Sequence, residues 1–269
     1  MLWPSAGLRL IRWENALIAA AGVMVGAWWV GGDPLLRSTV LAAAAAIALA
    51  AVANAYNDIT DVEIDRIAHP DRPLPSGAMS TRAAGLIVRV AAVMAVALST
   101  SAVSELGLVS IAVIAIMMLY SRVLKRLGLV GNLTVAALAS LPFLYGGWSV
   151  GRPVASLTLV ALAMPLHLAR EIAKDIEDAE GDSLVRRTLP VAAGKSVTNT
   201  VLLAALGAFL VALILFARSR PLFALAVLPA VLLAAIATHR AIAGKGRAPL
   251  LFKSAMLCAM ASLLVVREH

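Results

Sequence analysis

The sequence predicts an all-α protein that crosses a membrane about nine times. Of its 269 residues, 61% are hydrophobic and only 14% are charged, whereas a soluble domain of this length carries close to twice that charge. Apolar stretches of about 20 residues recur along the chain, and a helix of that length spans the hydrocarbon core of a bilayer. The single cysteine, Cys258, excludes intrachain disulfides and cysteine-rich metal sites.

Each expected span is an apolar run bounded by charged or turn-forming residues. The first follows Arg9 and Arg12 but is too long for a secretory signal peptide and lacks a cleavage site. The third is interrupted by Arg89, so its bounds are the least sharply defined. The nine spans are expected near 10–31, 36–57, 82–101, 106–121, 129–149, 153–172, 195–217, 221–240 and 248–266.

The basic residues predict the orientation of the chain. Most of the 23 lysines and arginines fall in the loops on one side of the nine spans, and such a bias marks the cytoplasmic side. We therefore expect a multi-pass protein of the cell membrane, with its N-terminus and its acidic loops in the cytoplasm. Because this bias accounts for the net charge of +8, nucleic acid is not an expected partner.

Two long cytoplasmic segments stand out, residues 57–81 and 171–194. They hold most of the 15 acidic residues, and long loops in a compact bundle are often functional. The spans that precede them are the second and the sixth, four apart in order. This spacing is consistent with duplicated four-helix units inside a single domain that covers residues 1–269.

The first acidic segment predicts a metal site. Asp58, Asp61 and Asp65 follow one another at i, i+3 and i+7, so they share one face of a helix, and Asn57 borders that face. Like charges this close repel one another and need cations. Oxygen ligands of this kind suit Mg²⁺, above all where diphosphate oxygens complete its shell. We expect all four residues to be metal ligands, with Asp58 and Asp61 catalytic.

The second acidic segment repeats this pattern. Asp175, Asp178 and Asp182 continue a helical stripe that begins at Glu171, and Lys174 lies where it can reach a phosphate. We expect the three aspartates to be metal ligands, Asp175 and Asp178 to be catalytic, and Lys174 to bind substrate. One acidic helix end can simply be a solvated cap, but two with matching spacing favour a paired site that draws electrons from an allylic diphosphate.

Other polar residues near the same side are expected to contact substrate. Arg72 lies in a loop made rigid by two prolines, where a structural turn is the alternative reading. The connector between the fourth and fifth spans is basic, and plain anchoring at the membrane surface would explain it equally well. The expected substrate-binding residues outside the second segment are Asn15, Asn57, Arg72, Tyr120, Arg122, Lys125, Arg126 and Asn132.

Together the two segments resemble the signatures of the UbiA superfamily of intramembrane prenyltransferases. The first, Asn57-Asp58-x-x-Asp61-x-x-x-Asp65, precedes Arg72-Pro73-Leu74-Pro75-Ser76-Gly77, and the second runs from Lys174 to Asp182. The resemblance covers nearly the whole chain. It implies a helical bundle with a cytoplasmic cap over a central cavity, a Mg²⁺-bound prenyl diphosphate beneath that cap, and transfer of the prenyl group to a hydrophobic acceptor.

Arg170-Glu171-Ile172 and Thr188-Leu189-Pro190 around the second signature are most similar to the branch of this family that makes archaeal-type ether lipids. That branch implies a geranylgeranyl donor and a geranylgeranylglyceryl phosphate acceptor. The core of the second signature is also similar to homogentisate prenyltransferases and chlorophyll synthases, so an aromatic or chlorophyll-type acceptor is an alternative. A cation-coupled transporter is the rival from another class, although both acidic clusters lie at one membrane edge and not at the midplane.

Overall fold

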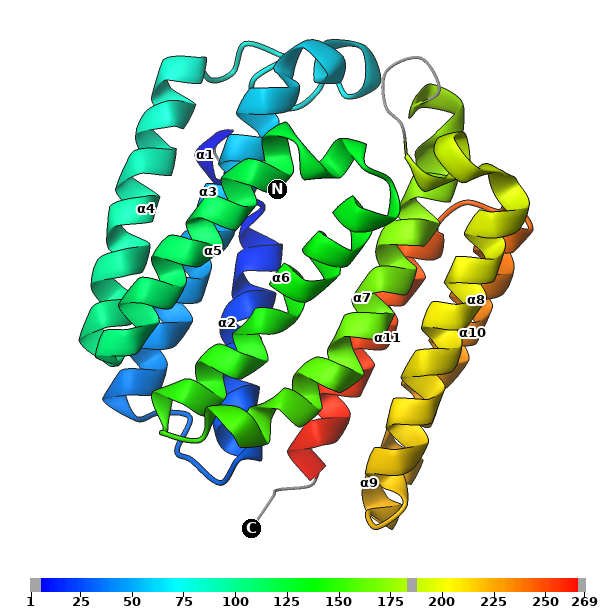
Figure 1. Cartoon of the computed structure of the whole chain (residues 1–269). Helices are drawn as coiled ribbons and strands as arrows, with labels where there is room; N and C mark the ends of the chain where they lie inside the picture. The colour runs from blue at the N-terminus through cyan, green and yellow to red at the C-terminus, as the bar shows by residue number, and fades with distance from the viewer. Residues whose placement is uncertain (1–5, 183–187, 266–269) are drawn as a thin grey trace, which may run out of the picture.

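The computed structural model describes residues 6–182 and 188–265, and side chains throughout these ranges except at 180–182. Within them the chain is helical and contains no strand (Figure 1). Nine described helices have 15 residues or more, and each coincides with one expected span. They are α2 (Trp13–Trp29), α3 (Arg37–Ala68), α4 (Thr81–Ala102), α5 (Ser104–Arg122), α6 (Leu129–Ser149), α7 (Pro153–Asp182), α8 (Leu189–Ala217), α10 (Leu228–Ile242) and α11 (Ala248–Ser262).

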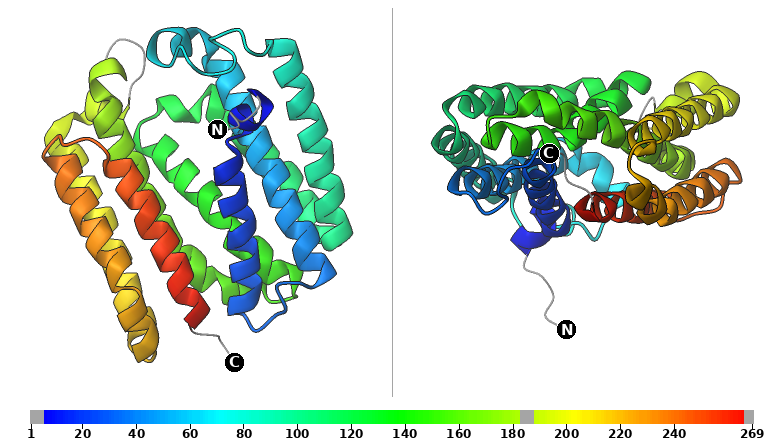
Figure 2. Two further views of the ribbon diagram at one scale, coloured as in Figure 1. Left: turned by 180° about the vertical axis from the view of Figure 1, so that it is seen from behind. Right: turned by 90° about the horizontal axis from the view of Figure 1, so that it is seen from below.

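The prediction of a polytopic helical bundle is confirmed. Seven of the described helices are long and apolar enough to cross a membrane, and α10 is a shorter apolar helix. The remaining described elements are short: α1 (Ala6–Ile11), η1 (Leu124–Arg126), α9 (Pro221–Ala226) and η2 (Leu263–Val265). Successive long helices pack side by side around the bundle, and α11 returns to contact α7 while η2 contacts α2 (Figure 2).

Two helices are longer than their apolar stretches require. α3 has 32 residues and α7 has 30, so both run well past the expected spans 36–57 and 153–172. Alanine, glutamate, lysine and isoleucine in these extensions are compatible with a helix, and α3 ends only at His69-Pro70, because the residue before a proline avoids helical geometry. The first expected loop is therefore shorter than predicted, since all of its acidic residues except Asp71 lie on α3.

The close approach of α2 and α6 depends on glycine. A Cβ atom on Gly146 would lie 2.0 Å from the carbonyl oxygen of Val23, and one on Gly26 would lie 2.4 Å from the carbonyl oxygen of Phe143. Small residues allow membrane helices to pack backbone against backbone. This contact fixes α2 against α6, and both helices contribute walls to the cavity described below.

Candidate active site

The acidic end of α3 is buried, although it lies past the apolar part of that helix. Asp58, Asp61 and Asp65 expose only 2%, 2% and 1% of their surface. Their spacing places them on one face of α3, as the sequence predicts, and that face is turned inward. Buried carboxylates require compensating charge, and basic side chains from three other segments supply it.

Two arginines neutralise the outer members of this stripe. Arg12, immediately before α2, donates to Asp58 at 2.7 Å and to the Asn54 side-chain oxygen at 3.0 Å. Arg72, from the loop after α3, donates to Asp65 at 2.6 Å and lies 3.8 Å from Asp58. One guanidinium thus spans two aspartates, and a planar five-donor group is suited to that arrangement.

The central aspartate is held by a lysine. Lys125, in η1, forms an ion pair with Asp61 and also donates to the hydroxyl of Thr60 at 3.1 Å. The side-chain amide of Asn57 donates to the other oxygen of Asp61 at 3.1 Å. Because the Lys125 side chain is only 7% exposed, this is a buried ion pair whose geometry is fixed by several hydrogen bonds.

The acidic end of α7 is more open. Asp175 is half-buried and accepts a hydrogen bond of 2.9 Å from the side-chain amide of Asn132, whereas Asp178 and Lys174 are exposed. Glu171, one turn earlier, is buried and pairs with Arg170. The expected ligand Asp182 ends the helix, but its side chain lies outside the described residues.

The connector between α5 and α6 links the two acidic helix ends. Lys125 from η1 reaches α3, while Asn132 from the first turn of α6 reaches α7. Gly128, between them, has a φ of 51° and lets the chain turn from one element into the next. This short segment therefore fixes both stripes relative to one another.

His69 shows how near the two stripes lie to each other. It follows α3 directly, and burial, followed by the nearby Arg72, lowers its pKa below the ordinary histidine value. Asp65 of the first stripe and Asp178 of the second act on the same imidazole in the opposite direction, and Lys174 also reaches it. The pKa of His69 thus responds to charges from both helix ends.

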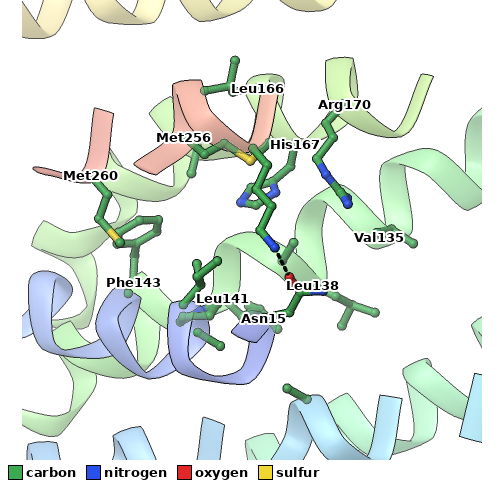
Figure 3. A pocket seen from close by; sticks show the side chains of 18 of the residues that line it. Asn15, Val135, Leu138, Leu141, Phe143, Leu166, His167, Arg170, Met256 and Met260 are labelled. Atoms are coloured by element: carbon green, nitrogen blue, oxygen red, sulfur yellow. Dashed lines mark hydrogen bonds between the residues drawn. The ribbon is translucent and has the colours of Figure 1, made fainter. Parts of the chain in front are cut away.

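A cavity of about 420 Å³ opens beneath the acidic ends. Near that end its wall is polar, with Asn57 from α3, Tyr120 from α5 and Lys174 from α7. Further along the bundle the wall becomes apolar, as Figure 3 shows for Leu138, Leu141, Phe143, Leu166, Met256 and Met260. A charged entrance above an apolar pocket can hold a molecule with an anionic head and a hydrocarbon tail.

The structure brings most of the predicted residues to this site. Those that line the cavity are Asn15, Asn57, Tyr120 and Lys174, and those that bond within the stripes are Asp58, Asp61, Asp65, Arg72, Lys125, Asn132 and Asp175. Two residues of the connector are placed differently. Arg122 is exposed and lies 5.6 Å above the Tyr56 ring, and Arg126 is exposed and does not line the cavity.

Several site residues were missed by sequence reasoning. Arg12 was treated as a membrane-surface cation, yet it pairs with Asp58. Asn54 lies one helical turn before Asp58, so the same periodicity could have extended the stripe to it. Lys253 lies inside the last apolar run and lines the cavity. A charged residue within a membrane span often marks a functional site, so the sequence could have identified it.

The site has the donor chemistry for Mg²⁺ without a complete protein cage. Among the side chains that the structure describes, no three histidines, cysteines, aspartates or glutamates are grouped closely enough to hold a metal by themselves. Mg²⁺ is usually bound through one or two carboxylates together with substrate phosphates. The described carboxylate and amide oxygens fit that kind of site, in which the phosphate supplies the remaining ligands.

Comparisons with known proteins agree with this architecture. The family model described as "UbiA prenyltransferase family" matches residues 17–260. Digeranylgeranylglyceryl phosphate synthase of Natronomonas pharaonis is 40% identical over 192 residues, which are 70% of this chain and 69% of that protein. The enzyme of the same name from Methanopyrus kandleri is 38% identical over 198 residues, or 73% and 72% of the two chains.

Solved structures share the fold at lower identity. A UbiA homologue from Aeropyrum pernix K1, determined without ligand, superposes with a TM-score of 0.82 at 22% identity, covering 94% of this chain and 98% of that one. A UbiA homologue from Archaeoglobus fulgidus, determined with DMAPP and Mg²⁺, gives a TM-score of 0.68 at 19% identity, covering 97% and 100%. These likenesses confirm the helical arrangement.

Proposed function

Because this chain belongs to the UbiA prenyltransferase family, we propose that it transfers a prenyl group from a prenyl diphosphate to a glyceryl phosphate lipid. One observation carries the proposal: Asn57 at the acidic end of α3 and Glu171 and Lys174 at that of α7 line one largely apolar cavity. The relatives named digeranylgeranylglyceryl phosphate synthase favour a geranylgeranyl donor and a geranylgeranylglyceryl phosphate acceptor.

The residues proposed to hold Mg²⁺ are those with oxygen atoms on the two stripes: Asn57, Asp58, Asp61, Asp65, Asp175 and Asp178. A UbiA homologue solved with DMAPP and Mg²⁺ supports this choice of ion. Bound Mg²⁺ would neutralise diphosphate oxygens and so make diphosphate a better leaving group.

The basic residues of the first stripe have a second role in this proposal. Arg12, Arg72 and Lys125 already point toward the buried aspartates. Arg12 and Arg72 each carry five N–H donors, more than their carboxylates use, whereas Lys125 contributes its positive charge. These donors are suited to the diphosphate oxygens, on which negative charge grows as the allylic C–O bond breaks.

The reaction itself is a substitution at the allylic carbon. The bond between that carbon and the diphosphate oxygen breaks, and its electron pair leaves with diphosphate. The acceptor hydroxyl then forms the new ether bond, and its proton passes to an oxygen of the released diphosphate. The apolar part of the cavity, which includes Phe143 and Leu141, keeps water from the electron-deficient carbon.

We also propose that the acidic ends face the cytoplasm of a cell membrane. The ends of α3 and α7 lie at the same end of the bundle as the basic loops, at the top of Figure 1. An excess of basic residues marks the cytoplasmic side of membrane proteins. This orientation gives the site access to a water-soluble diphosphate head while the prenyl chain stays in the bilayer.

The decisive assay uses the purified protein in detergent with radiolabelled geranylgeranyl diphosphate. Parallel reactions contain geranylgeranylglyceryl phosphate, homogentisate or chlorophyllide as the acceptor. We expect a labelled diether and stoichiometric diphosphate with the glyceryl phosphate alone, and no product after Mg²⁺ is removed with EDTA. Transfer of label to homogentisate or chlorophyllide would show that the acceptor is aromatic or of the chlorophyll type and not a glyceryl phosphate lipid. Absence of any diphosphate release would contradict prenyl transfer.

A further inference from the structure

Lys253 is a cavity residue that the diphosphate site does not account for. It lies in the second turn of α11 and is half-buried. Its ammonium donates a hydrogen bond of 2.7 Å to the side-chain oxygen of Asn15 on α2 (Figure 3). Both residues line the cavity, so this contact joins α11 to α2 across its polar part.

The partner of Lys253 differs from those of the two arginines that line the cavity. Arg12 pairs with Asp58 and Arg170 with Glu171, whereas among the described side chains no carboxylate forms an ion pair with Lys253. Its hydrogen-bond partner is a neutral amide. A half-buried ammonium without a counter-ion is costly, and it has two further donors that can bind an anion inside the cavity.

The position of this ammonium separates it from the aspartate stripes. Asn15 lies in the first turn of α2, three residues after Arg12, which precedes that helix. Arg12 holds Asp58, whereas Lys253 bonds to Asn15, so the two basic side chains have different partners. His167 and Arg170 of α7 line the cavity as well (Figure 3).

We propose that Lys253, positioned by Asn15, binds the phosphate of the acceptor lipid while the aspartate stripes bind the diphosphate of the donor. This inference rests on the function proposed above, which requires two anionic head groups in one cavity. A lysine ammonium is a compact point charge suited to a phosphate. The apolar residues Met256 and Met260, on the same helix, lie where the acceptor's hydrocarbon chain would follow.

This placement also orients the nucleophile. In a three-carbon glyceryl unit the free hydroxyl is close to the carbon that bears the phosphate. An anchor on that phosphate would therefore bring the hydroxyl near the allylic carbon of a donor whose diphosphate the stripes hold. Fixing the reacting groups in this way lowers the entropic part of the barrier. Lys253 would thus set acceptor specificity in favour of phosphorylated lipids.

The test compares K253M with the unchanged protein, using geranylgeranylglyceryl phosphate and its phosphate-free analogue as acceptors. We expect the KM for the phosphorylated acceptor to rise roughly 10- to 100-fold, the range expected for one lost hydrogen bond to a charged group. The KM for geranylgeranyl diphosphate should change less than about twofold, which is within ordinary surface-substitution effects. The preference for the phosphorylated over the phosphate-free acceptor should fall by the same factor as the affinity for the phosphorylated acceptor.

A matched control is K245M, which removes the same charge from the exposed loop before α11, and it should leave both KM values and the preference unchanged. An unchanged acceptor KM in K253M, or an equal rise in the donor KM, would overturn the assignment. If K253M does not fold, as judged by thermal unfolding in detergent, N15L gives the same readout, since it removes the hydrogen bond that positions the ammonium. Failure of the unchanged protein to use any glyceryl phosphate would instead overturn the proposed function.

Discussion

The two acidic helix ends carry similar stripes but differ in how their charge is balanced. On α3 the aspartates are almost fully buried, and basic residues from three separate segments neutralise them. On α7 the described aspartates are half-buried or exposed, and Asp175 is held by the neutral amide of Asn132. We infer that the α3 end is a preorganised half of the site, and that the α7 end is completed by the bound diphosphate and its cations.

This difference predicts that substitutions at the two ends separate stability from catalysis. Replacing one partner of a buried ion pair leaves the other charge buried and uncompensated. Replacing an exposed carboxylate leaves no buried charge without a partner. At the α3 end, substitutions should lower both the stability of the fold and the rate of prenyl transfer. At the α7 end, substitution of the exposed Asp178 should impair transfer but not folding.

The largest effect is expected for D61N. The change leaves Lys125 buried without its counter-charge, so the free energy of unfolding should fall by about 3–5 kcal/mol, and transfer should fall by at least roughly 10³-fold, as for loss of a preorganised electrostatic group. Thermal unfolding and product formation in detergent measure the two effects. E63Q is the matched control, because Glu63 is exposed and pairs on the surface with Arg66. Near-normal transfer by D61N would remove Asp61 from the site.

D178N should lose activity without losing stability. Asp178 is exposed, so the unfolding free energy should stay within about 0.5 kcal/mol of the unchanged protein. Prenyl transfer should fall roughly 100-fold, as when one electrostatic contact to the reacting group is removed. A clear loss of thermal stability would show that the carboxylates of α7 are as firmly held by their surroundings as those of α3.

N132A should impair transfer less than D178N does, but it should also lower stability. It removes the hydrogen bond that holds Asp175, and a bond to a charged group contributes about 1.5–3 kcal/mol. Transfer should fall about tenfold, because Asp175 is then less well oriented. The control is T134V on the same helix, whose hydroxyl bonds only to the backbone carbonyl of Val130. Equal behaviour of N132A and T134V would exclude a role for Asn132 at the site.

The smallest effect on transfer is expected for T60V, which removes one hydrogen bond to Lys125. The valine keeps the shape of the side chain but removes a hydroxyl that accepts from the ammonium, so stability should fall by about 1 kcal/mol. The Asp61–Lys125 ion pair should remain. Transfer should change less than about threefold, because the activation free energy should rise by less than about 1 kcal/mol. A loss as large as that of D61N would mean that Thr60, and not Asp61, positions the lysine.

The sequence allowed the helices and the acidic faces to be predicted, because both follow from local periodicity. Nine apolar runs fall on nine long helices of the described chain, and the i, i+3, i+7 spacing places Asp58, Asp61 and Asp65 on one buried face. The second span was expected near 36–57, whereas α3 continues to Ala68 and carries the acidic face as part of the same helix. The duplicated four-helix unit and the metal-ligand assignments stay predictions.

The pairing of charges could not be predicted in the same way. Arg12 and Asp58 are 46 residues apart, and Lys253 and Asn15 are 238 apart, so no local pattern connects them. Within one chain, many basic residues near the membrane surface look alike in sequence. Lys125 reaches Asp61, while Arg126, its neighbour, is exposed. Such choices depend on how the helices pack.

The central claim is that both acidic ends bind one donor diphosphate. Calorimetric binding of an unreactive geranylgeranyl thiodiphosphate with Mg²⁺ tests it in four proteins: the unchanged chain, D61N, D178N and the double variant. We predict that each single change removes most of the Mg²⁺-dependent affinity and that the double change removes little more, since groups that act as one unit are not additive. Normal affinity in D178N, or losses that simply add, would contradict a shared site.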